Sequence, residues 1–215
     1  MNLRWSKRGR KREKNKVKLV VGLGNYPEKY WLTKHNIGFL TVQEYVRKHN
    51  LKWRKEMFHP FLSAKDEGRD VLFLLPLTYM NNSGKAVGYF RNSVDPEDML
   101  LICDDLNLPW FRMRLRYQGS SGGHRGLESV FNALGTNKIP RLRLGIDRPK
   151  DGDVVEYVLS PFEEKEREDL PVYLSAAFAT VDRWVDGEDP QRLMSLVNDP
   201  DYVRKYFGGE DGAEI

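Results

Sequence analysis

Three short segments of the sequence place polar side chains directly after a run of apolar residues. They are Gly24-Asn25 after the apolar run 17–21, Met80-Asn81-Asn82 after the run 71–77, and Asp104-Asp105 after the run 99–103. Apolar runs of this length are typical of buried strands, and ligands of α/β proteins bind at the loops that follow the carboxyl ends of strands. We therefore expect these polar side chains to converge on one site.

Together with His35, these side chains offer the groups that acyl transfer to water requires. An imidazole can act as a general base, the carboxylate of Asp104 can orient it, and asparagine amides can donate hydrogen bonds to a carbonyl or its oxyanion. The one Gly-x-Ser-x-Gly match, residues 119–123, lies in a flexible loop of only Gly and Ser rather than in a nucleophile elbow, and no cysteine is in the setting of a nucleophile. A covalent route therefore has no obvious candidate. The pattern favours hydrolysis by an activated water.

Other interpretations of the same residues remain open. The segment Gly22-Leu23-Gly24 begins like a dinucleotide-binding loop, but Pro27 stands where the third glycine of Gly-x-Gly-x-x-Gly belongs. His35, near a predicted helix start, could be a capping residue. Asp104 and Asp105 with His35 or His124 could bind a metal, although two carboxylates without a fixed ligand spacing are weak evidence for such a site.

The elements that must position these residues follow from the hydrophobic periodicity. Strands are expected where apolar residues run together or alternate, and helices where they recur every three or four residues. The expected strands span residues 17–21, 61–65, 71–75, 99–103, 112–117 and 142–146, and the expected helices span residues 38–49, 82–90, 127–134 and 163–184. Strands that alternate with helices indicate one α/β domain, with a mixed, mostly parallel twisted sheet flanked by helices.

The expected strand 112–117 has a distinctive pattern. Arginine occupies positions 112, 114 and 116, and apolar residues occupy the positions between and after them. Because successive side chains of a strand point to opposite faces, three arginines share one face, which must contact solvent or phosphate.

Composition narrows the class of protein. The chain has 215 residues and one cysteine, Cys103, so no internal disulfide can form and no Cys-x-x-Cys zinc or redox site is present. The longest apolar stretches, such as residues 71–77, are far shorter than the roughly 18 residues of a membrane span. We expect a cytoplasmic protein without a membrane segment.

The formal net charge of +4 is unevenly distributed. Residues 1–16 contain eight Lys and Arg against one Glu, a local charge of +7 that leaves −3 for the rest of the chain. Such a basic arm is typical of a flexible polyanion-binding segment, and an inert extension fits it equally well. Residues 17–207 are expected to form the domain, and the acidic, glycine-rich residues 208–215 a disordered tail.

Five motifs in order along the chain resemble the bacterial peptidyl-tRNA hydrolase family. They are VVGLGNYPEKYWLTKHNIGF, LLPLTYMNNSGKAV, LLICDDLNLPWFRMRLRYQGSSGGHRGLES, PRLRLGIDRP and EYVLSPF. The resemblance implies an enzyme that hydrolyses the ester between a peptide and the 3′ ribose of tRNA, and so recycles tRNA from peptidyl-tRNA released prematurely. It also implies a monomer that needs no metal, no nucleotide cofactor and no obligate protein partner.

The resemblance assigns roles to residues by motif position. His35 would be the general base, Asp104 would hold and polarise its imidazole, and Asn25 and Asn81 would bind the peptide and the reacting carbonyl. The other positions that it implies at the substrate or the tRNA are Tyr30, Met80, Asn36, Arg116, His124, Arg125 and Arg143.

Two departures from the family pattern stand out. Many members read Gly-Gly-His-Asn-Gly where this chain has Arg125 in place of the asparagine, and the usual Asn-Pro-Gly appears as Asn25-Tyr26-Pro27. An arginine cannot accept a hydrogen bond, but it can hold a phosphate or the terminal adenosine. The alternative function is that of a non-catalytic RNA-binding member of the same fold, resembling the chloroplast intron-splicing relatives. The retained His35 and Asp104 argue against it.

Overall fold

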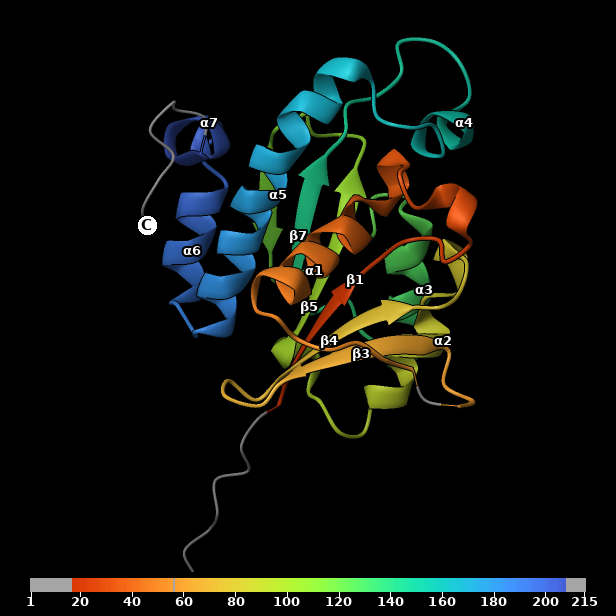
Figure 1. Cartoon of the computed structure of the whole chain (residues 1–215), viewed down its shortest axis with the longest axis vertical. Coiled ribbons are helices and arrows are strands. Elements are labelled where there is room, and N and C mark those ends of the chain that lie inside the picture. Colours follow the sequence, from red (N-terminus) through yellow and green to blue (C-terminus); the bar gives the residue numbers. More distant parts are fainter. Residues whose placement is uncertain (1–16, 56, 208–215) are drawn as a thin grey trace, which may run out of the picture.

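A seven-stranded sheet runs through the centre of the molecule (Figure 1). The computed structural model describes residues 17–55 and 57–207, so the predicted basic arm and acidic tail lie outside the described residues. The strands are β1 (Lys18–Gly22), β2 (Arg54–Lys55), β3 (Phe61–Asp66), β4 (Val71–Pro76), β5 (Met99–Asp105), β6 (Met113–Arg116) and β7 (Arg141–Gly145). Their order across the sheet is β2-β3-β4-β1-β5-β7-β6.

The four central strands, β4, β1, β5 and β7, are mutually parallel. The outer pairings β2-β3, β3-β4 and β6-β7 are antiparallel. A single mixed sheet flanked by helices is therefore confirmed, but the prediction that it is mostly parallel is wrong. Parallel and antiparallel pairings are equal in number among the described strands, because the strands at both edges run against their neighbours. The carboxyl ends of the four parallel strands all meet at one edge of the sheet.

Helices cover both faces of the sheet (Figure 1). One face carries α1 (Ile37–Lys48), α5 (Glu164–Val185), α6 (Pro190–Val197) and α7 (Tyr202–Phe207), and the other carries α2 (Gly84–Val87) and α3 (Arg125–Leu134). The short helix α4 (Val154–Val158) lies beyond the carboxyl ends of the central strands.

Two apolar cores fill the space between the sheet and its helices. Along β1, Val20 packs into the core under α1 and α5, whereas Leu19 and Val21 pack into the core under α2 and α3. Because both faces are buried, the central strands are apolar at nearly every position, which is why they appear in the sequence as continuous runs rather than alternating patterns.

The expected helix 82–90 is the one predicted element that the structure breaks up. It consists of a 3-10 turn (Met80–Asn82), the single turn of α2, and a second 3-10 turn (Gly88–Phe90). Gly84 packs so tightly on α3 that a Cβ atom there would lie 2.2 Å from the carbonyl oxygen of Ser129, and its N–H donates to the Ser129 hydroxyl at 3.0 Å. Contact with α3 therefore sets the path of this segment.

A second close approach positions the start of α1. A Cβ atom on Gly38 would lie 2.3 Å from the carbonyl oxygen of Ile102 and 2.7 Å from that of Leu23. Only a residue without a side chain lets the helix start so close to β1 and β5. As a consequence, the turn before α1, which carries His35, lies directly beside the end of β5.

Among the described residues, no helix has both the length and the apolar character needed to cross a membrane.

Candidate active site

A pocket of about 550 Å³ opens at the carboxyl edge of the parallel strands. Most of the residues predicted from the sequence line it, and they come from five separate segments of the chain. These residues are Asn25, Tyr30, His35, Met80, Asn81, Asp104, His124, Arg125 and Arg143. Two predicted residues, Asn36 and Arg116, are not part of the lining. The polar side chains that follow the strands thus converge on one pocket, as predicted.

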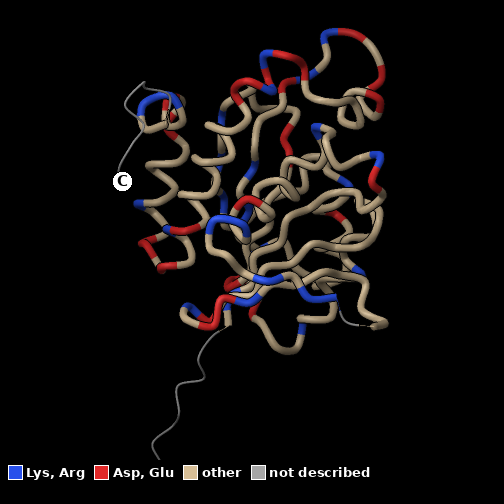
Figure 2. Tube along the Cα trace, viewed as in Figure 1, with Lys and Arg blue, Asp and Glu red and all other residues tan. Residues whose placement is uncertain are grey.

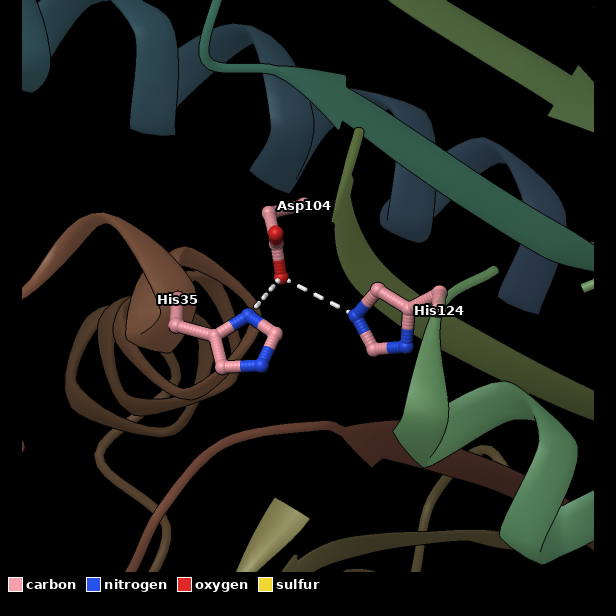
Figure 3. Close-up of side chains that lie close together, drawn as sticks. All are labelled: His35, Asp104 and His124. Carbon is pink, nitrogen blue, oxygen red and sulfur yellow. Dashed lines mark hydrogen bonds and ion pairs between the residues drawn. The ribbon is translucent and has the colours of Figure 1, made fainter. Parts of the chain in front are cut away.

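Among the residues that line the pocket, one carboxylate oxygen lies between two imidazoles (Figure 3). Oδ1 of Asp104 lies 2.8 Å from Nδ1 of His35 and 3.0 Å from Nε2 of His124. Asp104 is the penultimate residue of β5, and its side chain is only 2% exposed. The side chain of His35 is 14% exposed and lines the pocket. Because His35 uses Nδ1 for the carboxylate, its Nε2 is left for a group in the pocket.

The second imidazole has a fixed tautomer. Nδ1 of His124 accepts hydrogen bonds from the backbone N–H groups of Gly126 and Leu127, at 3.1 and 3.2 Å, and so caps the start of α3. Nε2 must therefore carry the proton that it donates to Asp104. Both ring nitrogens of His124 are engaged within the protein, so the structure favours a role in holding Asp104 over direct contact with substrate.

The surroundings of Asp104 keep it ionised. Burial alone would raise the pKa of the Asp104 carboxyl, but the charge interactions and hydrogen bonds of His35 and His124 outweigh burial and hold the pKa well below its usual value. The Asp104 carboxylate can therefore orient the ring of His35, while the ring of His124 holds the carboxylate in place.

This lowered pKa predicts how stability depends on pH. A carboxyl whose pKa is lower in the folded than in the unfolded chain stabilises the fold above its unfolded pKa of about 3.9, and the contribution is lost as the pH falls toward the lower folded value. We expect the free energy of unfolding of Asp104→Asn to lie below that of the wild type at pH 7 and to approach it below about pH 4. Urea unfolding at a series of pH values measures this, and a difference that grows on acidification would contradict it.

The same three side chains offer ligand atoms within 4.8 Å of one another, a spacing that a metal ion could use. Metal ligands at about 2.0–2.2 Å from a tetrahedral ion lie roughly 3.3 Å or more apart. The N···O distances of 2.8 and 3.0 Å are instead those of direct hydrogen bonds, and His124 has already committed Nδ1 to the backbone. The arrangement fits a hydrogen-bonded group better than a metal site.

Asn25 follows β1 and is held by two neighbours. Its Oδ1 accepts from the N–H of Met80 at 2.9 Å, while its backbone N–H donates to Oδ1 of Asn36 at 2.8 Å and its carbonyl accepts from Nδ2 of Asn36 at 2.9 Å. The prediction that Asn36 contacts the substrate is therefore corrected, because its side chain is fully buried and occupied by Asn25. With its oxygen fixed, Asn25 has its Nδ2 group left to donate into the pocket.

Met80 lies against the start of α3. A Cβ atom on Gly126 would lie 2.4 Å from the sulfur of Met80 and 3.0 Å from Cε1 of His124, so a glycine is needed where these two pocket residues meet the helix. Asn81, the next residue, is exposed and lines the pocket from the same turn.

Arginines occupy another part of the lining. Arg125 is exposed on the first turn of α3, Arg148 is exposed after β7, and Nε of Arg143 lies 3.0 Å from Oδ2 of the buried Asp105. A Cβ atom on Gly122 would lie 2.8 Å from the Arg143 guanidinium, so the glycine loop before α3 packs directly on it. The pocket therefore combines a neutral amide side with a basic side.

Arg116 lies outside the pocket, on the edge of the sheet. The predicted alternation is confirmed over β6, where Arg114 and Arg116 are exposed and Met113 and Leu115 are buried. The third arginine, Arg112, precedes the strand and is half-buried. In the β6-β7 ladder, Arg116 lies opposite Arg141, and Arg114 lies opposite Arg143. Residues opposite each other in an antiparallel pair share a face, so Arg114 and Arg116 lie on the same face as Arg143 of the pocket. The Arg141 side chain is instead buried, and its guanidinium donates to the carbonyls of Asn137 and Ile139.

Part of the pocket wall was missed from the sequence. Four residues of α4 and its end, Val154, Val155, Val158 and Leu159, line the pocket, and two of them, Val154 and Val155, are exposed. Asp153 caps the start of the helix, and its carboxylate accepts from the N–H groups of Val155 and Glu156. The sequence Asp-x-x-Glu before a short apolar run is the signal that could have revealed it.

Comparison with known proteins agrees with this geometry. A model of the peptidyl-tRNA hydrolase family matches residues 19–205. A peptidyl-tRNA hydrolase of Lactobacillus acidophilus is 40% identical over 185 residues, which are 85% of this chain and 100% of that protein. One from Aquifex aeolicus is 42% identical over 192 residues, 87% of this chain and 99% of that protein.

A solved structure leads to the same assignment. The crystal structure of peptidyl-tRNA hydrolase from Acinetobacter baumannii superposes with a TM-score of 0.78 at 33% sequence identity, covering 86% of this chain and 96% of that one. The match extends over both cores and every segment that lines the pocket, since the family model alone spans residues 19–205. From its motifs, its fold and these relatives, the chain belongs to the peptidyl-tRNA hydrolase family.

Proposed function

We propose that this chain hydrolyses the ester that joins a peptide, or an N-blocked amino acid, to the 3′ ribose of tRNA. The observation that carries the proposal is the pair of His35 and Asp104, which lies beside the amide of Asn25 in one pocket with a basic side. The same pocket offers a base for water, a carboxylate for the base, donors for a carbonyl and arginines for phosphates. Both parts of a peptidyl-tRNA thus have a matching surface.

His35 would activate the water. With Nδ1–H donating to Asp104, Nε2 takes a proton from a water molecule whose oxygen attacks the ester carbonyl. The tetrahedral intermediate then expels the 3′ oxygen of the ribose, which receives the proton from the imidazolium. The ionised Asp104 stabilises the imidazolium that exists between these two transfers.

The asparagines would bind the reacting peptide. Nδ2 of Asn25 is available because Met80 holds the side-chain oxygen, and Asn81 projects from the turn that follows β4. A neutral amide donor can stabilise the developing oxyanion or hold a peptide carbonyl without requiring any particular peptide side chain. An amide also does not favour the charged ammonium of a free amino acid, which would support selection of blocked substrates.

The experiment that tests this function compares two substrates that differ at one group. The protein should release N-acetyl amino acid from N-acetylaminoacyl-tRNA in catalytic amounts, and it should act much more slowly on the same aminoacyl-tRNA with a free amino group. Equal rates on the two substrates would contradict the role proposed for the asparagines, and rates equal to a buffer blank on both would contradict the function itself.

We propose that Arg125 contacts the RNA backbone. It stands at an exposed position of the pocket lining, beside Arg143 and Arg148, where many family members have an asparagine. Figure 2 shows that basic and acidic residues are interspersed over the described chain, so RNA binding must depend on local groups of arginines rather than on a uniformly basic surface.

Arg125→Asn should weaken tRNA binding and flatten its dependence on salt. Loss of one phosphate contact reduces the slope of log K against log salt concentration by roughly 0.7–0.9. The measurement is tRNA affinity at several salt concentrations, with Arg183→Asn, in the last turn of α5 and outside the pocket lining, as the matched control. A slope unchanged in Arg125→Asn would show that Arg125 touches no phosphate.

We also propose that the protein works as a cytoplasmic monomer without a cofactor or an obligate protein partner. All the groups in the mechanism come from one chain and one pocket. The non-catalytic RNA-binding alternative gains no support from the comparisons, since the relatives described above are all named as hydrolases.

A further inference from the structure

A buried ion pair lies next to the proposed base in sequence. Lys34, which directly precedes His35, is 1% exposed, and its ammonium contacts Oε2 of Glu166 near the start of α5. Glu166 is 8% exposed, and the same Oε2 accepts the backbone N–H of Glu163 at 2.7 Å, which closes the capping box of α5. The pair therefore connects the His35 turn to a helix 132 residues further along the chain.

The segment between α4 and α5 surrounds this pair. The ammonium of Lys34 lies 5.0 Å from the ring centroid of Tyr157 and 5.8 Å from that of Phe162. The backbone N–H of Lys34 donates to the carbonyl of Ser160 at 3.1 Å, and Thr33 forms an isolated bridge with Pro161. These contacts join the His35 turn to the end of the helix whose valines form the pocket wall.

Stability alone does not explain such a pair. Removing two charges from water costs free energy that their attraction often fails to recover, and apolar residues of similar volume are frequently as stable or more so. An ion pair does, however, specify one arrangement of the segments that it joins, because any other arrangement leaves a buried charge without its partner. A site that places a base against a carbonyl depends on this kind of specificity.

We infer that Glu166 is a positioning residue. Through its ion pair with Lys34, it fixes the position of the turn that carries His35 relative to helix α4, which forms part of the pocket wall. This inference rests on the proposed function, since it concerns the geometry of the same reaction. Glu166 itself lies outside the pocket lining and does not reach the substrate.

Glu166→Gln tests the inference directly. Glutamine keeps the length of the side chain and an oxygen for the N–H of Glu163, but it removes the charge that holds Lys34. We expect kcat to fall about tenfold with KM within about twofold of the wild type, since small displacements of a catalytic group reduce rate far more than they reduce the binding of a large ligand. The control is Glu188→Gln, which removes a carboxylate that pairs with Arg183 and Arg192 at the other end of α5 and should leave both constants unchanged.

A second variant separates positioning from stability. In Lys34→Met/Glu166→Gln no buried charge is left unpaired, so the thermal stability lost in Glu166→Gln should return. The kcat of the double variant should nevertheless stay low, because the ion pair that links the two segments is still absent. A wild-type kcat in both variants, measured well below their melting temperatures, would overturn the inference. Rates are measured on the wild type first, so an inactive wild type would contradict the proposed function and would be distinguished from failure of the inference.

Discussion

His35→Ala should lower kcat for the hydrolysis of N-acetylaminoacyl-tRNA by at least about 10²-fold, the lower end of what a positioned general base contributes. The imidazole is placed by the turn before α1, which Gly38 brings against the end of β5, and by the hydrogen bond of 2.8 Å to Asp104. Alanine removes the only atom that the proposed mechanism uses to accept the proton of water. KM should change by less than about threefold, because tRNA affinity depends mainly on phosphate contacts.

The control for this variant is His49→Ala at the other end of α1. The ring of His49 packs against Tyr45, with centroids 4.4 Å apart, and its Nε2 lies 3.4 Å from Oδ1 of Asp182. His49 is not part of the pocket lining. Its loss should leave kcat nearly unchanged. If His35→Ala retained more than about a tenth of the wild-type kcat, His35 would not be the base, since that residual rate exceeds what general base catalysis allows.

Asp104→Asn should lower kcat by between about tenfold and 10²-fold. Asparagine has almost the shape of aspartate, and its Oδ1 can accept from both imidazoles as the carboxylate oxygen does, so the substitution removes charge with little change in position. A hydrogen bond to a charged group contributes about 1.5–3 kcal/mol, and every 1.36 kcal/mol of lost transition-state stabilisation is a factor of ten in rate. The lost interaction is the stabilisation of the imidazolium that forms when His35 takes the proton of water.

The matched control is Asp105→Asn on the same strand. Asp105 is as deeply buried as Asp104, but its carboxylate faces Nε of Arg143 and the N–H of Asn107. This variant should weaken tRNA binding more than it lowers kcat, because it releases an arginine of the basic side. Equal losses of kcat in the two variants would show that the charge of Asp104 has no special relation to His35.

Much of the site could be predicted from the sequence because its residues follow buried strands. The apolar runs 17–21, 71–77 and 99–103 belong to parallel strands in the middle of one sheet, and side chains that follow such strands must meet at one edge. The pairing of His35 with Asp104 also depended on family motifs, since spacing alone left capping and metal binding open.

The sequence did not reveal which polar residues face inward. Asn36 follows His35 directly, yet the turn before α1 directs one side chain into the pocket and the other into the protein, where it holds Asn25. Likewise, His124 lies in a glycine-rich loop, and only its capping of α3 shows that both of its nitrogens are engaged. Hydrogen bonds between segments distant in sequence decide these roles, and no local pattern encodes them.

The elements that prediction missed are short or depend on tertiary contacts. The strand β2 has two residues, both exposed, and so carries no hydrophobic pattern. Helix α6 does begin with a readable signal, because Asp189 caps it and Pro190 occupies its first turn. The partnership of Lys34 with Glu166 spans 132 residues, and neither residue type predicts burial.

The central claim is that the His35–Asp104 pair activates water for ester hydrolysis without a metal. The most direct measurement is the release of N-acetyl amino acid from N-acetylaminoacyl-tRNA by the wild-type protein, after treatment with a chelator of transition metals and with His35→Ala and a buffer blank run beside it. The wild type should turn over many equivalents of substrate at a rate unaffected by the chelator, and His35→Ala should approach the blank. A chelated wild type that releases no more product than the blank would contradict the account.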